Sequence, residues 1–113
     1  MLALSCWPRE VVVIGPNTIV YVGEIRDSKV RIGIEAPNEH KILRMDLLVQ
    51  ILEGNGYRFV GVDGQSLMYK KDGRVLNVVE SIKELIKDGK MKHALESFNK
   101  PGTPNNLNKS ALN

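Results

Sequence analysis

Apolar and polar residues alternate through much of the first half of the chain, which predicts a series of short β-strands. The clearest case is residues 29–35, where valine and isoleucine occupy the even positions and charged residues or glycine the odd ones. This period of two indicates a strand with one buried and one solvated face. Similar apolar runs, bounded by Pro, Gly, Asn or Ser, predict further strands at residues 2–7, 10–14, 18–25 and 40–43.

A different spacing follows at residues 44–53, where Leu48, Ile51 and Leu52 share one face of a predicted helix that stops at the glycines after it. The remaining pattern predicts strands at 57–62, 66–71 and 74–79, with Asp72-Gly73 as a hairpin turn. A helix is expected at 81–88 and its continuation at 90–98, with Met91, Leu95 and Phe98 on one side. The fold class is therefore mainly β with short helices.

The same pattern divides the chain into three parts. We expect a β domain at residues 1–53 and an extension of β-hairpin and helix at residues 54–99. The tail at residues 100–113 is rich in Pro, Gly, Asn and Ser and is expected to be disordered. Five short strands and one helix make a poor core in isolation, which predicts an oligomer.

The 113 residues are 42% hydrophobic and 26% charged, as in an ordinary globular protein. No apolar run approaches the ~20 residues of a membrane span, and Trp7 to Glu10 interrupt any signal peptide. The single cysteine fits a reducing compartment, so a cytoplasmic protein with no membrane association is expected. Charge is uneven: residues 1–53 carry six Lys/Arg against seven Asp/Glu, and residues 54–113 carry ten against six.

Three stretches carry a family resemblance: Met1 to Ser5, Ile14-Gly15, and Val30 to His40, where an alternating strand ends in a proline turn. Over residues 1–52 the chain resembles the carbon storage regulator family, the CsrA/RsmA translational regulators. The resemblance implies a five-stranded dimer in which two chains interleave their strands. It also implies binding to GGA triplets in messenger leaders, with control of translation or mRNA stability.

The resemblance assigns RNA contacts to Leu4, Ile42 and Arg44, and it places two family arginines where this chain has Cys6 and Trp7. A good arginine–base contact is worth about 1–3 kcal/mol, so their loss predicts altered or weakened binding. Two replacements are conceivable: Trp7 stacking on a base, and Arg9, which stands at a family glycine, reaching a phosphate.

Plainer interpretations stand beside these. A tryptophan such as Trp7 is more often an anchor for packing or protein contact than a platform for RNA stacking. Arg44 is by default a solvated residue where a helix begins. Cys6 is most simply a small strand residue. We assign Leu47, Leu48 and Leu52 to packing. Four lysines of the C-terminal helices are interspersed with acids and are read as a solvated face, namely Lys83, Lys87, Lys90 and Lys92.

The residue spacing shows no motif of an enzyme. His40 and His93 lack partners at zinc-ligand spacing, the glycines make no phosphate loop, and no catalytic arrangement stands out. We therefore expect that the protein is not an enzyme and binds no cofactor.

Two functions remain. The first is a homodimeric, divergent regulator that binds GGA-containing mRNA leaders. The alternative is a relative deficient in RNA binding that acts through protein contacts, either in mixed dimers with a paralogue or with a regulatory partner.

Overall fold

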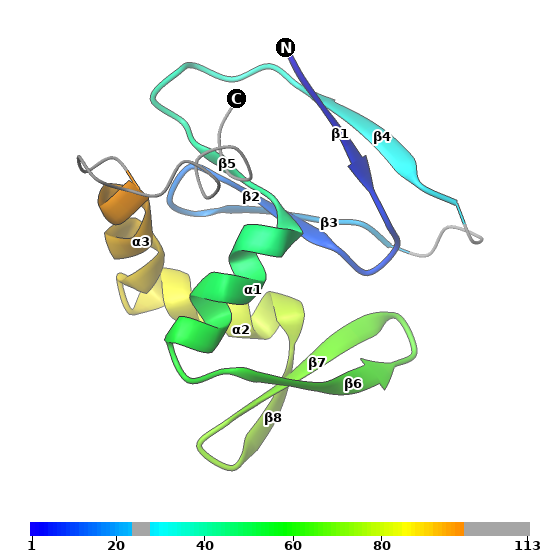
Figure 1. Cartoon of the computed structure of the whole chain (residues 1–113), viewed down its shortest axis with the longest axis vertical. Helices are drawn as coiled ribbons and strands as arrows, with labels where there is room; N and C mark the ends of the chain where they lie inside the picture. The colour runs from blue at the N-terminus through cyan, green and yellow to red at the C-terminus, as the bar shows by residue number, and fades with distance from the viewer. Residues whose placement is uncertain (24–27, 99–113) are drawn as a thin grey trace.

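The computed structural model describes residues 1–23 and 28–98, with the side chains of Ser97 and Phe98 excepted. Eleven elements follow one another in these residues (Figure 1). The N-terminal half holds β1 (Leu2–Cys6), β2 (Val11–Ile14), β3 (Thr18–Tyr21), β4 (Val30–Ile34), β5 (Ile42–Leu43) and α1 (Met45–Gly54). The C-terminal half holds β6 (Arg58–Asp63), β7 (Ser66–Lys71), β8 (Arg74–Asn77), α2 (Val78–Lys87) and α3 (Lys90–Phe98).

Three small antiparallel sheets organise these strands. β1 pairs with β4, from Leu2 opposite Ile34 to Cys6 opposite Val30. β2 is the centre of a second sheet in the order β3-β2-β5, and β6-β7-β8 form the third. The predicted fold class, mainly β with short helices, is confirmed. β1 pairs with β4 of the same chain here, so the interleaving of two chains stays a prediction.

The run Val11-Val12-Val13 shows why the first and second sheets and the helices stack in layers. All three valines are buried. A continuous apolar run is typical of a strand covered on both faces. Val12 packs with Leu4, Cys6, Val22 and Ile42 in a small core between the first two sheets. Val11 and Val13 belong to a larger core on the opposite face of β2.

That larger core joins the two halves of the chain. From the N-terminal half it contains residues of β2, β5 and α1, and from the C-terminal half it contains Tyr57, Tyr69, Val78, Ile82, Leu85, Met91 and Leu95. The C-terminal segment therefore supplies apolar cover that the first five strands and α1 lack in isolation. The same chain therefore supplies the core that the β domain lacks by itself, and the oligomer stays a prediction.

Several predicted boundaries were wrong, and the clearest lies at Val78-Val79. Two β-branched valines favoured a strand to residue 79, but α2 begins at Val78. Asn77 caps the helix: its side chain accepts from the Glu80 N–H at 2.8 Å, and its own N–H donates to Glu80 Oε1 at 3.0 Å. This capping box satisfies two backbone donors at the helix start and outweighs local strand preference.

Other boundaries shift by a few residues. β3 ends at Tyr21, the fifth strand holds only Ile42 and Leu43, and the helix predicted from Arg44 begins at Met45. Residues 24 and 25 of the predicted third strand and the predicted tail at 100–113 lie outside the described residues. Met91 and Leu95 are buried as expected, and the side chain of Phe98 is also outside the description.

A network of polar side chains ties the third sheet to α2. Glu84 accepts from the Tyr57 hydroxyl at 2.6 Å and from both terminal nitrogens of Arg74, at 2.6 and 3.2 Å. The Arg74 and Tyr57 hydrogen bonds lower the pKa of Glu84 from 4.5 to about 2. Burial, followed by the hydrogen bond to Glu84, raises the pKa of Tyr57.

The pKa of Glu84 gives a pH-dependent stability. Because its folded-state pKa lies below the unfolded value, its stabilising contribution is complete above about pH 4.5 and is lost as the pH falls toward 2. Urea unfolding followed at several pH values in this window checks this, with Glu84→Gln expected to flatten the dependence. An unchanged pH profile in Glu84→Gln would show that other carboxylates dominate.

Candidate nucleic-acid interface

The connection between β1 and β2 is a tight turn that presents Trp7. The Glu10 N–H donates to the Trp7 carbonyl at 3.3 Å, and the Trp7 N–H donates to Glu10 Oε1 at 2.8 Å. Pro8 takes the second position and Arg9 the third, with φ at +76°. Proline second and positive φ third are typical of a type II turn. The two hydrogen bonds hold the backbone that carries the indole.

Trp7 is 48% exposed, although a tryptophan is highly buried on average. Lys29 Nζ lies 5.1 Å from the centroid of its ring. A cation at this distance is attracted to the face of an indole. The turn therefore offers an aromatic surface and a positive charge side by side.

Trp7 and Lys29 line a cavity of about 250 Å³ that also includes Arg44. Its full lining is Ser5, Cys6, Trp7, Glu10, Val11, Val12, Lys29, Arg44, Met45 and Asp46. Pockets for drug-sized ligands run from ~300 to ~1,000 Å³, so this one suits a smaller group such as a single nucleobase. Strand β1 and the turn that follows it meet the start of α1 here, although α1 is distant from both in sequence.

Arg44 reaches this cavity from the N-cap position of α1. Its backbone carbonyl accepts from the N–H groups of Leu47 and Leu48, at 3.2 and 3.0 Å, and its side chain makes no capping bond. A cation at a helix N-terminus opposes the helix dipole, so helix formation does not explain an arginine here. Asp46 follows in the first turn, and its Oδ1 accepts the Leu47 N–H at 3.0 Å.

The N-terminal half of the chain is similar in sequence to a known protein family. Residues 1–53 match the sequence model of CsrA, described as the global regulator protein family. The translational regulator CsrA of Lachnospira eligens is 34% identical over 73 residues, which span its whole length and 63% of this chain. The chain belongs to the CsrA family.

Other translational regulators named CsrA match a shorter stretch. The protein of Nocardioides sp. is 42% identical over 55 residues, covering 49% of this chain and 66% of its own length. That of Geobacter sulfurreducens is 38% identical over 55 residues, covering 49% and 70%. No solved structure matches the chain. The family identification therefore rests on sequence, and most strongly on the N-terminal half.

Two of the CsrA-type positions predicted to touch RNA are buried in this chain. Leu4 is 2% exposed and Ile42 is 1% exposed, and both pack in the core between the first two sheets. The structure therefore does not bring them to the surface beside Trp7 and Arg44. Their role in RNA contact stays a prediction, and packing is what the structure shows for them.

The Arg9 side chain, for which the sequence suggested an RNA phosphate, contacts another part of this chain. Its Nε donates to the carbonyl of Gly64 at 3.0 Å, in the turn between β6 and β7. A residue other than glycine in the left-handed region costs about 1–2 kcal/mol. This chain keeps an arginine there and gives it a contact with the C-terminal half.

Cys6 is buried and unsuited to reactivity. Desolvation, followed by the charge of Glu10, raises the pKa of its thiol, while Arg44 opposes this shift. A nucleophilic cysteine needs a lowered pKa. The interpretation of Cys6 as a small strand residue fits its place in the core.

Sequence reasoning did not single out Lys29, Glu10 or Asp46 as parts of the cavity. They are charged residues in strands, turns and helix starts, where a solvated role is the usual one, and only tertiary packing places them around Trp7. The positive φ of Arg9 had a local signal, since Pro8 precedes it in a turn between two strands.

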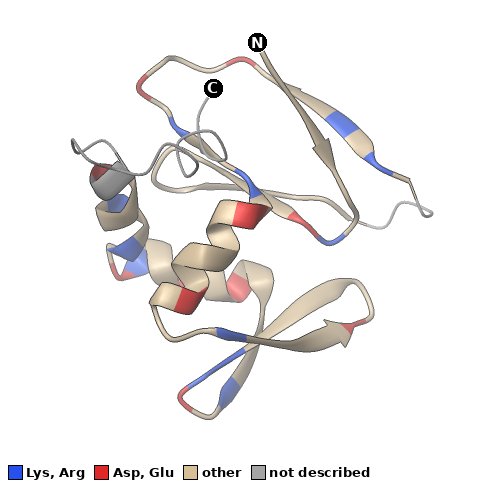
Figure 2. Ribbon diagram, viewed as in Figure 1, with Lys and Arg blue, Asp and Glu red and all other residues tan. Residues whose placement is uncertain are grey.

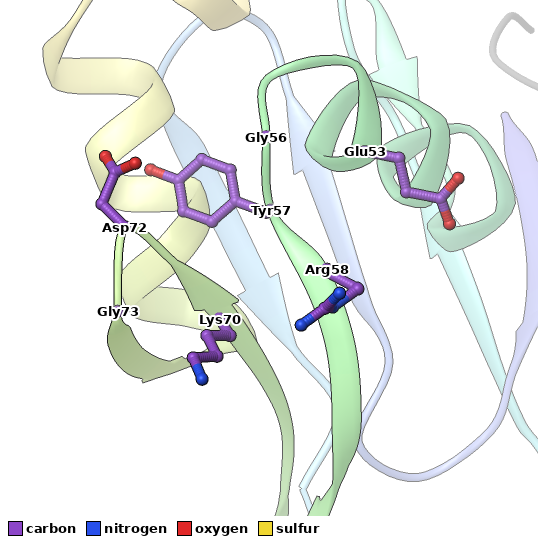
Figure 3. Close-up of a pocket in the computed structure, with 7 residues that line it drawn as sticks. All are labelled: Glu53, Gly56, Tyr57, Arg58, Lys70, Asp72 and Gly73. Carbon is purple, nitrogen blue, oxygen red and sulfur yellow. The ribbon is translucent and has the colours of Figure 1, made fainter.

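Two further cavities lie beside the C-terminal half. Figure 3 shows one of about 540 Å³, lined by Glu53, Gly56, Tyr57, Arg58, Lys70, Asp72 and Gly73. It holds two acids and two bases, and the Tyr57 hydroxyl is already bonded to Glu84, so it favours no ligand charge. The other, about 480 Å³, lies between α1 and α3.

Charge, ligand geometry and helix length add three observations. Figure 2 shows Lys/Arg and Asp/Glu intermixed on the C-terminal helices, as for a solvated face. Within residues 1–23 and 28–98, no group of three His, Cys, Asp or Glu side chains is placed to hold a metal ion. In the same residues no helix is long and apolar enough to cross a membrane.

Proposed function

We propose that this protein is an RNA-binding post-transcriptional regulator that acts as a cytoplasmic homodimer on GGA-containing messenger leaders. The observation that carries the proposal is the cavity that gathers Trp7, Lys29 and Arg44. Membership of a family whose matched relatives are named translational regulators supports the same function. The standard first-strand arginines are absent, so the chemistry of binding has to come from other groups.

Trp7 supplies the first of these groups. Its exposed indole sits on a hydrogen-bonded turn, and loops of RNA are recognised by stacking splayed bases on aromatic side chains. Base–aromatic stacking contributes about 1–3 kcal/mol per base. One stacked base therefore offsets about one lost arginine contact.

The charged residues around the indole supply two further kinds of contact to RNA. Lys29 and Arg44 attract phosphate and donate to base acceptors. Glu10 and Asp46 repel phosphate but accept hydrogen bonds from base N–H groups. A guanine presents such donors on its Watson–Crick edge, at N1 and the 2-amino group. The mixed charge of this cavity therefore favours a guanine edge over bare backbone, in agreement with a GGA triplet.

Fluorescence anisotropy of a labelled hairpin with GGA in its loop tests this function. We expect binding that falls about tenfold or more when the triplet is CCA, since one lost base contact is worth about 1–3 kcal/mol. Inosine in place of the guanines removes only the 2-amino groups and is expected to weaken binding to a smaller extent. Sedimentation of the RNA-free protein measures whether it is a dimer.

Salt dependence separates specific from general binding. Two phosphate contacts, one each from Lys29 and Arg44, predict a log–log slope of about −1.4 for single-stranded RNA. Binding that ignores the triplet and collapses with salt would contradict the proposal.

One observation favours the alternative of a protein-contact role. The C-terminal sheet exposes four large apolar side chains, Phe59, Val60, Val62 and Val75. Phe59 and Val75 lie on opposite faces of this sheet, because they pair with the adjacent residues Tyr69 and Lys70. If GGA-dependent binding is absent, these exposed residues become the first to test, by mixing the protein with a standard-length relative and measuring mixed dimers.

A further inference from the structure

The turn between β6 and β7 touches the base of the Trp7 turn through two side chains. Arg9 Nε donates to the Gly64 carbonyl at 3.0 Å, across 55 residues of sequence. The Tyr21 hydroxyl donates to the carbonyl of Gln65, across 44 residues. Figure 1 shows the tip of this hairpin beside the connection from β1 to β2. Both acceptors are backbone atoms, so the contact depends on where the hairpin lies and not on its side chains.

The two donors lie in the Trp7 turn and at the end of β3, which pairs with the strand that follows the turn. Arg9 is the third residue of that turn, and its N–H donates to the Val22 carbonyl at 2.8 Å. Tyr21 is paired opposite Val11 at the start of β2. The Val22 N–H in turn donates to the Glu10 carbonyl at 2.9 Å. Arg9 and Tyr21 are therefore connected by backbone hydrogen bonds to the turn that carries Trp7.

Arg9 also occupies a backbone conformation that glycine adopts without strain. Such conformations persist where surrounding structure determines them. The Gly64 contact is the interaction of the Arg9 side chain that a glycine would lack. An arginine at this position therefore makes physical sense as an anchor for the hairpin.

We infer that the β6–β7 hairpin acts as a clamp that fixes the Trp7 turn in the orientation that stacks on RNA. Arg9 and Tyr21 are its positioning residues, and neither needs to touch the RNA. The consequence for RNA rests on the function proposed above, whereas the ordering of Trp7 is a property of the protein alone.

Trp7 makes this inference measurable, because it is the only tryptophan in the chain. Acrylamide quenching and time-resolved anisotropy of its fluorescence, on the full chain without RNA, report how firmly the turn is held. The test variants are Arg9→Gly, which suits the positive φ, and Tyr21→Phe, which removes one hydroxyl. The matched control is Gln65→Ala, which keeps the backbone carbonyl that Tyr21 contacts.

Both test variants are expected to increase quenching and fast rotation of Trp7, and Gln65→Ala is expected to match the unaltered protein. Affinity for the GGA hairpin should then fall about threefold to tenfold in both, as for the loss of one ordering hydrogen bond. Unchanged Trp7 dynamics in both variants would overturn the clamp. Loosening in Arg9→Gly alone would also overturn it, since residue 9 would then act within its own turn.

The two readouts keep this inference apart from the proposed function. A protein that binds no GGA hairpin, but whose Trp7 loosens in both variants, has the clamp and lacks the proposed function. A protein that binds the hairpin equally well in all variants, with Trp7 unchanged, has the function and lacks the clamp.

Discussion

Replacing Ile82 with alanine is expected to lower the free energy of unfolding by about 2–5 kcal/mol, the usual cost of a large truncation in a core. Ile82 is fully buried in the cluster that joins α2 to β2, β5 and α1. A domain of this size has a total stability of about 5–15 kcal/mol, so the loss is a large fraction. Because the core is shared, both halves of the chain should unfold together and earlier.

Urea unfolding followed by two probes measures this effect. Trp7 fluorescence reports on the N-terminal half, and far-UV circular dichroism reports on the whole chain. The control is Val75→Ala in the same half, which is 59% exposed and should change stability by no more than about 0.5 kcal/mol. A Trp7 transition that stays in place while the dichroism transition moves would mean that the halves fold independently.

Arg44→Ala is expected to weaken binding of the GGA hairpin by about 1–3 kcal/mol, roughly fivefold to 150-fold. Arg44 lies at the helix start, where its charge opposes the helix dipole, and it lines the cavity beside Trp7. Trp7→Ala is expected to cost a similar amount through lost stacking. Because both residues line one cavity, the double variant should lose less than the sum of the two.

Arg58→Ala is the matched control for charge. Arg58 lies on β6 and lines a separate cavity with Lys70. The Arg58→Ala substitution removes the same unit of positive charge as Arg44→Ala. It should leave the preference for GGA over CCA unchanged. An equal loss of affinity in Arg44→Ala and Arg58→Ala, with no change in the preference for GGA over CCA, would mean that Arg44 contributes only general charge attraction.

The site was only partly foreseeable. The family resemblance placed Arg44 beside the first strand of a second subunit, whereas the structure lines one cavity with Trp7 and Arg44 of the same chain. Leu4 and Ile42 came from the same resemblance but pack in a core of this chain. Lys29, Glu10 and Asp46 carried no signal, because a charged residue next to a turn is usually solvated.

Among the described residues, the sequence alone determined the order and type of the elements through its hydrophobic periods, and it determined membership of the CsrA family through its first half. Those properties are local or pattern-based, so they can be found without coordinates.

Only the tertiary structure decided what covers the second face of β2 and where the β6–β7 hairpin lies. The cover comes from Tyr57, Tyr69, Ile82 and their neighbours, which join the core from far along the chain. The hairpin lies against Arg9 and Tyr21, which are more than forty residues away. Contacts at such separations depend on the simultaneous packing of all three sheets, and no period or motif within one segment encodes them.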